Sequence, residues 1–271
     1  MNEFDPSQPC QPFRADRSPG RGRSGNLLLF VQQGDRRFVV KSHDRPGNAP
    51  DTSIRRLQWE VDAVRAFAAI GVQVLRPVWG PADTLELQVE GQPLTLRHVL
   101  VFPFHDGRTL QEAIRQTPDP VPLVREAARR ILERHRRARS VCEIHSDGAP
   151  HNIFEDWTWF DLDELPSTRD LRTAKAGEVW RFLTGVIDVT PLGQARTRVT
   201  AFCDVYDDRD VLRLARELRR KTCPLLRMLL QPYQFCRLAF GKSSSLGRLR
   251  TGRELSRYLA ETNRQTPRPQ R

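Results

Sequence analysis

Cysteine is scarce in this 271-residue chain, and its positions follow no pattern. The five cysteines are far apart, and none pairs with another as Cys-x-x-Cys. A disulfide scaffold uses an even set of cysteines, and a structural zinc site uses ligands paired at short spacing. We therefore expect neither a disulfide framework nor a structural zinc site. The cysteines are Cys10, Cys142, Cys203, Cys223 and Cys236.

Long apolar runs are also lacking. The longest span only a handful of residues, whereas a membrane-spanning helix needs about 20. The first residues, Met1 to Pro6, do not show the basic segment followed by an apolar one that marks a secretory signal. We therefore expect a cytoplasmic protein.

Acidic residues are in the minority, with 33 Asp and Glu against 44 Lys and Arg, for a net charge of +11. A basic protein attracts anionic partners such as nucleotides, phosphosugars, acidic lipids or nucleic acids. An arginine-rich composition equally reflects a GC-rich coding bias. The chain has no zinc-finger pattern and no aromatic-rich RNA-binding motif, so we do not expect nucleic acid as a partner.

A short polar motif is the most informative part of the sequence. It reads His-Ser-Asp-Gly-Ala-Pro-His-Asn from His145 to Asn152, and Asp161 follows after a Trp-Phe pair. Phosphoryl transfer needs one carboxylate at the acceptor hydroxyl. It also needs an amide oxygen and a second carboxylate on the Mg²⁺ ions that bridge the phosphates. We predict Asp147 as the catalytic residue and Asn152 and Asp161 as metal ligands. Asp163 is the alternative to Asp161.

Upstream lies a glycine-rich run, Gly-Arg-Gly-Arg-Ser-Gly, followed by an apolar segment at 27–31 that is typical of a strand. A dinucleotide site needs such glycines to open a helix, whereas a kinase-type loop needs them between two strands. A second strand-like segment ends at Lys41. We expect the glycines to cover the phosphates of ATP. An alternative for Lys41 is an ordinary solvated strand end. The glycines are Gly20, Gly22 and Gly25.

A helix is predicted from about Asp51 to Gly71, because apolar residues recur there at helical spacing. Glu60 lies near the apolar face of this helix. A carboxylate that is partly buried needs a cation, and Lys41 is the natural candidate. The alternative is a solvated glutamate on the flank of the helix.

With these residues in this order, the chain resembles the protein-kinase-like superfamily from about Gly20 to about Asp163. It most resembles the bacterial branch that includes lipopolysaccharide-core (heptose and Kdo) kinases and aminoglycoside phosphotransferases. The resemblance implies an α+β, bilobal protein-kinase-like fold, with a small antiparallel-sheet N-lobe and a mainly helical C-lobe. It also implies an ATP-dependent phosphotransferase that uses Mg²⁺, with Lys41 paired to Glu60 and holding the α- and β-phosphates.

The chain departs from that family in three places. Ser146 stands where the bacterial kinases have glycine. The lysine that Ser/Thr protein kinases carry two residues after the catalytic aspartate is missing after Asp147. The loop between Asn152 and Asp161 is shorter than usual. Ser146, the short loop before Asp161 and the arginines within the glycine run keep open a pseudokinase, which would bind without turnover.

The expected division of the chain follows the same resemblance. Phe104 lies in the predicted hinge, where backbone groups would meet the adenine edge of ATP. The segments are a flexible arm with a first strand near 11–15 (1–19), an N-lobe (20–102), a hinge (103–108), a C-lobe (109–262) and a disordered tail (263–271).

The acceptor is the least constrained part of the prediction. A helix begins by about Leu171, which leaves little room after Asp163 for the peptide-binding segment of protein kinases. We therefore expect a hydroxyl on a lipopolysaccharide-core sugar or a similar small or glycolipid acceptor, with a Ser/Thr protein kinase as the alternative. The apolar, arginine-bearing stretch 224–240 indicates either a peripheral contact with an acidic membrane surface or an ordinary helix pair.

Overall fold

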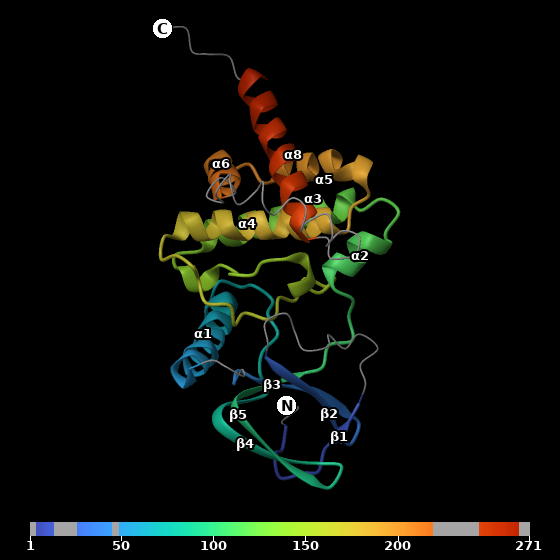
Figure 1. Cartoon of the computed structure of the whole chain (residues 1–271), viewed down its shortest axis with the longest axis vertical. Helices are drawn as coiled ribbons and strands as arrows, with labels where there is room; N and C mark the ends of the chain where they lie inside the picture. Colours follow the sequence, from blue (N-terminus) through green and yellow to red (C-terminus); the bar gives the residue numbers. More distant parts are fainter. Residues whose placement is uncertain (1–3, 14–25, 45–48, 219–243, 266–271) are drawn as a thin grey trace. The chain divides into compact units, whose positions relative to one another are not determined.

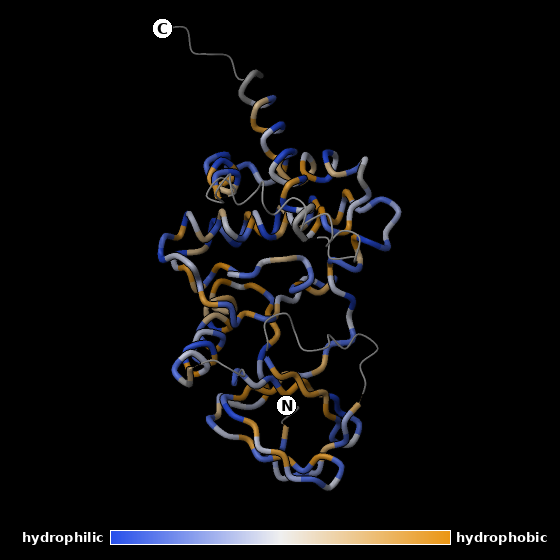
Figure 2. Tube along the Cα trace, viewed as in Figure 1, coloured by the Kyte–Doolittle hydropathy of each residue, from blue (hydrophilic) through white to orange (hydrophobic). Residues whose placement is uncertain are grey.

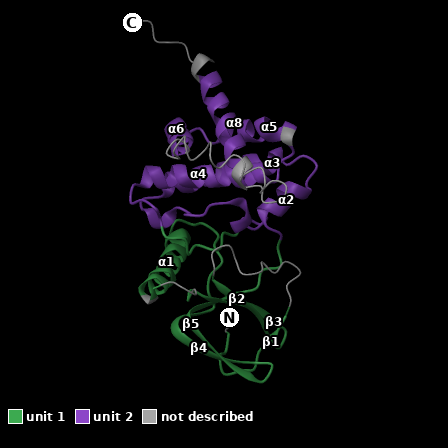
Figure 3. Cartoon of the chain, viewed as in Figure 1, with its two compact units in different colours: residues 1–107, 158–165 green, residues 108–157, 166–271 purple. Residues whose placement is uncertain are grey.

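The computed structural model describes residues 4–13, 26–44, 49–218 and 244–265. They belong to two compact units, drawn in different colours in Figure 3. The first unit comprises residues 1–107 and 158–165, and the second comprises residues 108–157 and 166–271. The first holds an antiparallel sheet and the second is mainly helical, so the expected α+β class is confirmed.

The first unit is built on a five-stranded antiparallel sheet with the order β1-β2-β3-β5-β4 (Figure 1). Helix α1 (Pro50–Ala69) follows β3, as predicted from its apolar spacing. Gly34, with φ of 58°, allows the tight turn between β2 and β3. The strands are β1 (Gln11–Pro12), β2 (Leu27–Gln33), β3 (Arg36–Ser42), β4 (Trp79–Val89) and β5 (Gln92–Pro103).

The two faces of strand β3 have different surroundings. Phe38 and Val40 join an apolar cluster with residues of β2, β4 and β5. Successive side chains alternate across a sheet, so Lys41 points to the opposite face. Its ladder partner Leu100 packs there with Leu57 of α1. The strand register therefore places Lys41 on the face that α1 covers.

The second unit is organised around helix α4, which contacts α5, α6 and α8. Apolar positions along its helices appear in orange in Figure 2. Thr109 and Glu112 form a capping box at the start of α2. The helices are α2 (Leu110–Gln116), α3 (Val121–Arg137), α4 (Leu171–Asp188), α5 (Ala195–Val205), α6 (Arg209–Leu218) and α8 (Ser244–Gln265), with short turns η1 (Val141–Glu143), η2 (Pro150–Asn152) and η3 (Leu192–Gln194).

Some expected features have different limits or lie outside the described residues. Helix α8 continues to Gln265, so residues 263–265 are helical and do not belong to a disordered tail. The segment 158–165 belongs to the first unit although it follows part of the second in the sequence. The glycine run Gly20–Gly25 and the stretch 224–240 lie outside the described residues. Among the described helices, none is long and apolar enough to cross a membrane.

Candidate functional site

Lys41 is the centre of a buried ionic cluster in the first unit. The residue is 4% exposed. Its Nζ atom lies 2.8 Å from Glu60 Oε1 and 2.6 Å from Asp161 Oδ1. Asp163 Oδ1 lies 3.7 Å from the same nitrogen. The predicted ion pair between Lys41 and Glu60 is therefore present, and the alternatives of a solvated lysine and a solvated glutamate are wrong.

The electrostatics of the cluster keep both partners charged. Burial opposes the positive charge of Lys41, but the carboxylates of Asp161, Asp163 and Glu60 outweigh it and raise the lysine pKa. Burial would likewise raise the pKa of Glu60. The ammonium of Lys41 and a hydrogen bond from His43 overcome that effect and hold the glutamate pKa below its usual range.

Asp161 and Asp163 have different environments. The side chain of Asp163 is 2% exposed, and its Oδ2 accepts a hydrogen bond of 2.5 Å from Asn26. The side chain of Asp161 is 33% exposed, and its φ of 57° lies in the left-handed region that aspartate tolerates better than most residues. Of the two, Asp161 is therefore the one whose carboxylate can reach a metal ion.

The ionised form of Asp161 is held at a cost. Burial and the nearby carboxylates of Asp163 and Glu60 raise its pKa to about 6, against the attraction of Lys41. No group of three or more His, Cys, Asp or Glu side chains in the described part of the chain could hold a metal. Mg²⁺ commonly takes one or two carboxylates and completes its shell with water and phosphate oxygens. Asp161 fits that mode of binding.

The predicted catalytic loop lies in the second unit and is tied together internally. Asn152 is 3% exposed, and its Nδ2 donates to the backbone oxygen of Asp147 at 2.8 Å and to Asp147 Oδ2 at 3.2 Å. With Nδ2 engaged, Oδ1 is the atom of Asn152 that suits a metal ion. The Asp147 side chain is 42% exposed. Its carboxylate is thus oriented by Asn152 and open to solvent.

His145 is hydrogen-bonded to the backbone of this loop. It is 1% exposed, and its Nδ1 accepts a hydrogen bond of 3.2 Å from the backbone N–H of Asp147. A ring nitrogen that accepts carries no proton. The hydrogen bond therefore ties the buried His145 ring to the backbone of the loop at Asp147.

Helix α4 packs closely against the catalytic loop at two places, each of which involves a glycine. A Cβ atom on Gly185 of α4 would lie 2.4 Å from Cδ of Pro150, so α4 and η2 touch closely. A Cβ atom on Gly148 would lie 2.4 Å from Cγ of Glu178. Glu178 is buried and held by Arg134 and by His135 Nε2, at 2.8 Å. Burial opposes its charge, but Arg134 and His135 lower its pKa to about 2.

Phe104 of the predicted hinge is held by the first unit. Its backbone N–H donates to the carbonyl of Arg37 at 2.9 Å. Its ring packs edge-on against Phe13, with 5.0 Å between centroids, and the guanidinium of Arg37 lies 4.9 Å from the ring centre. Of the hinge backbone groups expected to meet adenine, the N–H of Phe104 therefore already has an acceptor in this structure.

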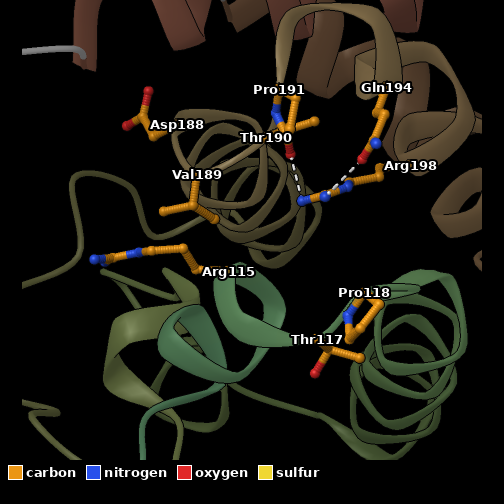
Figure 4. A pocket seen from close by; sticks show the side chains of 9 residues that line it. All are labelled: Arg115, Thr117, Pro118, Asp188, Val189, Thr190, Pro191, Gln194 and Arg198. Atoms are coloured by element: carbon orange, nitrogen blue, oxygen red, sulfur yellow. Dashed lines mark hydrogen bonds between the residues drawn. The ribbon is translucent and has the colours of Figure 1, made fainter.

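A cavity of about 740 Å³ opens in the second unit, and no predicted site residue lines it. Arg198, which is 4% exposed, donates to Thr190 Oγ1 at 2.8 Å and to Gln194 Oε1 at 3.0 Å (Figure 4). Sequence analysis missed the cavity because three separated segments form it. Its lining residues are Arg115, Thr117, Pro118, Asp188, Val189, Thr190, Pro191, Gln194 and Arg198.

Comparisons with known proteins include two distant matches to solved structures. No protein-family model and no curated protein matches the chain. An amicoumacin kinase solved in complex with AMP-PNP, Ca²⁺ and Ami matches at 13% identity and a TM-score of 0.43, over 98% of this chain and 90% of that chain. A microcompartment-associated aminopropanol kinase matches at 12% identity and a TM-score of 0.39, over 95% of this chain and 92% of that chain. Likeness of this degree assigns no activity.

Proposed function

We propose that the chain is an ATP-dependent phosphotransferase that moves the γ-phosphate of ATP to a hydroxyl group of a small molecule. The observation that carries the proposal is the buried Lys41, bridged to Glu60 and Asp161. Buried ion pairs are weak contributors to stability, so a cluster of this kind needs another reason. An ammonium held in a fixed direction is what the phosphates of a nucleotide require.

The remaining roles follow from the exposure and orientation of each group. Asp161 and Asn152 would hold Mg²⁺, which neutralises the charge of the phosphates when bound. Asp147, with its exposed carboxylate fixed by Asn152, would orient the acceptor hydroxyl and receive its proton. The role of the glycine run Gly20–Gly25 in covering the phosphates rests on the family resemblance alone.

The acceptor is proposed to be a small, polar molecule. The chain between Asp163 and the start of α4 at Leu171 is short. Its residues, 164–170, contain no helix or strand. Protein kinases use a longer folded segment at this point of the chain to bind peptides. The short connection supports a sugar hydroxyl, of the lipopolysaccharide-core type, over a protein side chain.

The polar cavity is a suitable docking site for such an acceptor. It lies at the end of α4, and its residue Asp188 is one helical turn beyond Gly185, which packs on Pro150 of η2. Two arginines, the carboxylate of Asp188, hydroxyl groups and an amide line it, which suits a hydroxyl-rich sugar. Arg115 lines the cavity, is exposed, and has no ion-pair or hydrogen-bond partner among the described residues.

Transfer of labelled phosphate tests the proposed function. The purified chain is incubated with γ-labelled ATP and Mg²⁺ in parallel with a lipopolysaccharide extract and with a generic protein substrate. We expect label in the carbohydrate fraction and none in the protein. Label in the protein substrate would contradict a small-molecule acceptor and would indicate a protein kinase. Absence of label from both fractions, with ATP still bound, would favour the pseudokinase.

Arg115→Ser tests the cavity once an acceptor is known. We expect the KM for the acceptor to rise on the order of tenfold, because a charge-assisted contact is lost, with the KM for ATP unchanged. Arg125→Ser removes the same charge from an exposed position on α3 that does not line the cavity. Equal effects of the two variants would mean that the cavity is not the docking site.

A further inference from the structure

His43 is a buried neighbour of the Lys41 cluster that the proposed roles leave unused. It lies two residues after Lys41 and is 0% exposed. Its Nε2 is 2.7 Å from Glu60 Oε2, the oxygen that Lys41 does not contact, and its Nδ1 is 3.0 Å from the carbonyl oxygen of His98. Glu60 is therefore held from two sides, by Lys41 at one oxygen and by His43 at the other.

The chemistry of these two contacts fixes the protonation of the ring. A backbone carbonyl can only accept a hydrogen bond, and an ionised carboxylate can only accept. Glu60 is ionised because Lys41 pairs with it and its pKa is lowered. The carbonyl oxygen of His98 also accepts from the backbone N–H of His43 at 2.9 Å. A neutral imidazole has one ring nitrogen without a proton, and its lone pair would face an acceptor oxygen at 2.7 or 3.0 Å. Only an imidazolium presents an N–H to both oxygens.

The charge count of the cluster agrees with this state. A buried ionic group is tolerated when it is paired and hydrogen-bonded, so the charges around Glu60 should balance. The charged groups of the cluster come from β3 and the residues that follow it, from α1 and from the segment 158–165, and the carbonyl of His98 in β5 faces the His43 ring. With His43 protonated, three cations meet three carboxylates. They are Lys41, His43 and Arg56, against Glu60, Asp161 and Asp163.

We propose that His43 is a positioning residue that acts through Glu60. The imidazolium holds Oε2 of Glu60, so that Oε1 stays on Lys41 and the ammonium keeps one direction. Without this donor one oxygen of Glu60 would lose its partner, and the glutamate would hold Lys41 less firmly. The consequence for catalysis rests on the proposed function, but the state of the ring and its coupling to Glu60 do not.

His135 gives an internal contrast in the same chain. It is also buried, and its Nε2 also faces a glutamate, Glu178, at 2.8 Å. Its Nδ1, however, faces the hydroxyl of Tyr206 at 2.7 Å, and a hydroxyl can donate. A neutral ring satisfies both contacts there, and burial lowers the pKa of His135. The geometry therefore separates two buried histidines, one charged and one neutral.

Nitrogen NMR of histidine-labelled protein tests the proposed state directly. The chain has six histidines, and the His43→Gln and His135→Gln variants identify the two resonances of interest. At neutral pH we expect two protonated ring nitrogens on His43 and one on His135. A His43 ring with a single proton would overturn the inference. This result does not depend on whether the chain turns over ATP.

A double-mutant cycle with Glu60 tests the positioning role. Gln can place an amide donor near the Nε2 position, whereas Asn keeps a donor only near Nδ1. We expect His43→Asn to raise the KM for ATP on the order of tenfold, since a charge-assisted hydrogen bond is lost, and His43→Gln to restore most of it. In a Glu60→Gln background the Asn substitution should add nothing.

The split between KM and kcat separates positioning from general damage. His43→Asn should raise the KM for ATP while kcat stays near the wild-type value, because the ring of His43 contacts Glu60 and the carbonyl of His98. Additive effects of the His43 and Glu60 substitutions, or an equal loss in kcat, would overturn the role. If the wild type binds no ATP, the proposed function fails. In that case the free energies of unfolding of the same variants test whether His43 and Glu60 are coupled, and additive effects would contradict the coupling.

Discussion

Asp161 carries an electrostatic cost that most carboxylates in a folded chain avoid. Its pKa of about 6 lies above the value of 3.8 for a free aspartate. Above pH 6 the folded chain must hold an ionised group that its surroundings disfavour, whereas the unfolded chain ionises it freely. Its contribution therefore destabilises the fold at neutral pH and fades as the pH falls from about 6 toward 4.

Asp161→Asn should accordingly raise the thermal midpoint at pH 7 while it weakens Mg²⁺-dependent nucleotide binding. With a third of the side chain exposed, we discount the pKa shift and expect a gain of about 1 kcal/mol. Asp163→Asn is the matched control. It removes the buried charge that faces Lys41 and Arg56, and it should lower the midpoint. A lower thermal midpoint for Asp161→Asn would contradict the electrostatic cost that we assign to the ionised form of Asp161.

Asp147→Asn separates chemistry from binding. The amide keeps the shape of the side chain but cannot receive the acceptor proton, so turnover should fall by at least about 100-fold. Because the side chain is 42% exposed, stability and ATP affinity should stay near the wild-type values. Asp207→Asn, at an exposed carboxylate of the same unit, should leave turnover unchanged. Steady-state kinetics beside calorimetric ATP titration would show whether the two effects separate.

At the scale of elements, helix α4 acts as the platform of the catalytic loop. Its Glu178 is fixed by two side chains of α3, Arg134 and His135, and so cannot move away from the loop residue Gly148. The ion pairs therefore fix the loop position as well as the helix packing.

Gly148→Ala should disturb the loop, because the new methyl group would meet Glu178 well inside contact distance. We expect a lower turnover number with a small change in ATP affinity, measured by kinetics and calorimetry. Gly177→Ala is the control in α4 itself, since nothing lies within 4 Å of a Cβ atom there. That variant should gain about 0.5–1 kcal/mol from helix propensity. Equal turnover numbers for the two variants would contradict the claim that α4 fixes the position of the catalytic loop.

Glu178→Gln should lower the free energy of unfolding by about 3–5 kcal/mol, because Arg134 would keep a buried charge without its partner. The pKa of Glu178 is lowered to about 2 from 4.5. Its stabilising contribution is therefore complete above pH 4.5 and is lost as the pH falls toward 2. In the Glu178→Gln variant, the loss of stability between pH 4.5 and 2 that comes from protonation of Glu178 should be absent. An acid transition that matches the wild type would contradict the burial of an ionised Glu178.

At the scale of the whole chain, local patterns predict the order of strands and helices and the pair Lys41–Glu60. Both residues sit on elements with clear apolar periodicity, so their faces can be assigned. The contacts of Asn26 with Asp163, which join residues 137 positions apart, have no local signal. His43 lies only two residues from Lys41, but its role depends on a carbonyl of β5 that no pattern reveals.

The central claim is that the Lys41 cluster receives the phosphates of ATP. Calorimetric titration with ATP, with and without Mg²⁺, tests it most directly, using the wild type and Lys41→Met. We predict saturable binding that weakens without Mg²⁺ and is lost in the variant, with ATP–Mg²⁺ raising the wild-type thermal midpoint by mass action. Absence of binding at millimolar nucleotide, or equal binding by wild type and variant, would contradict the account.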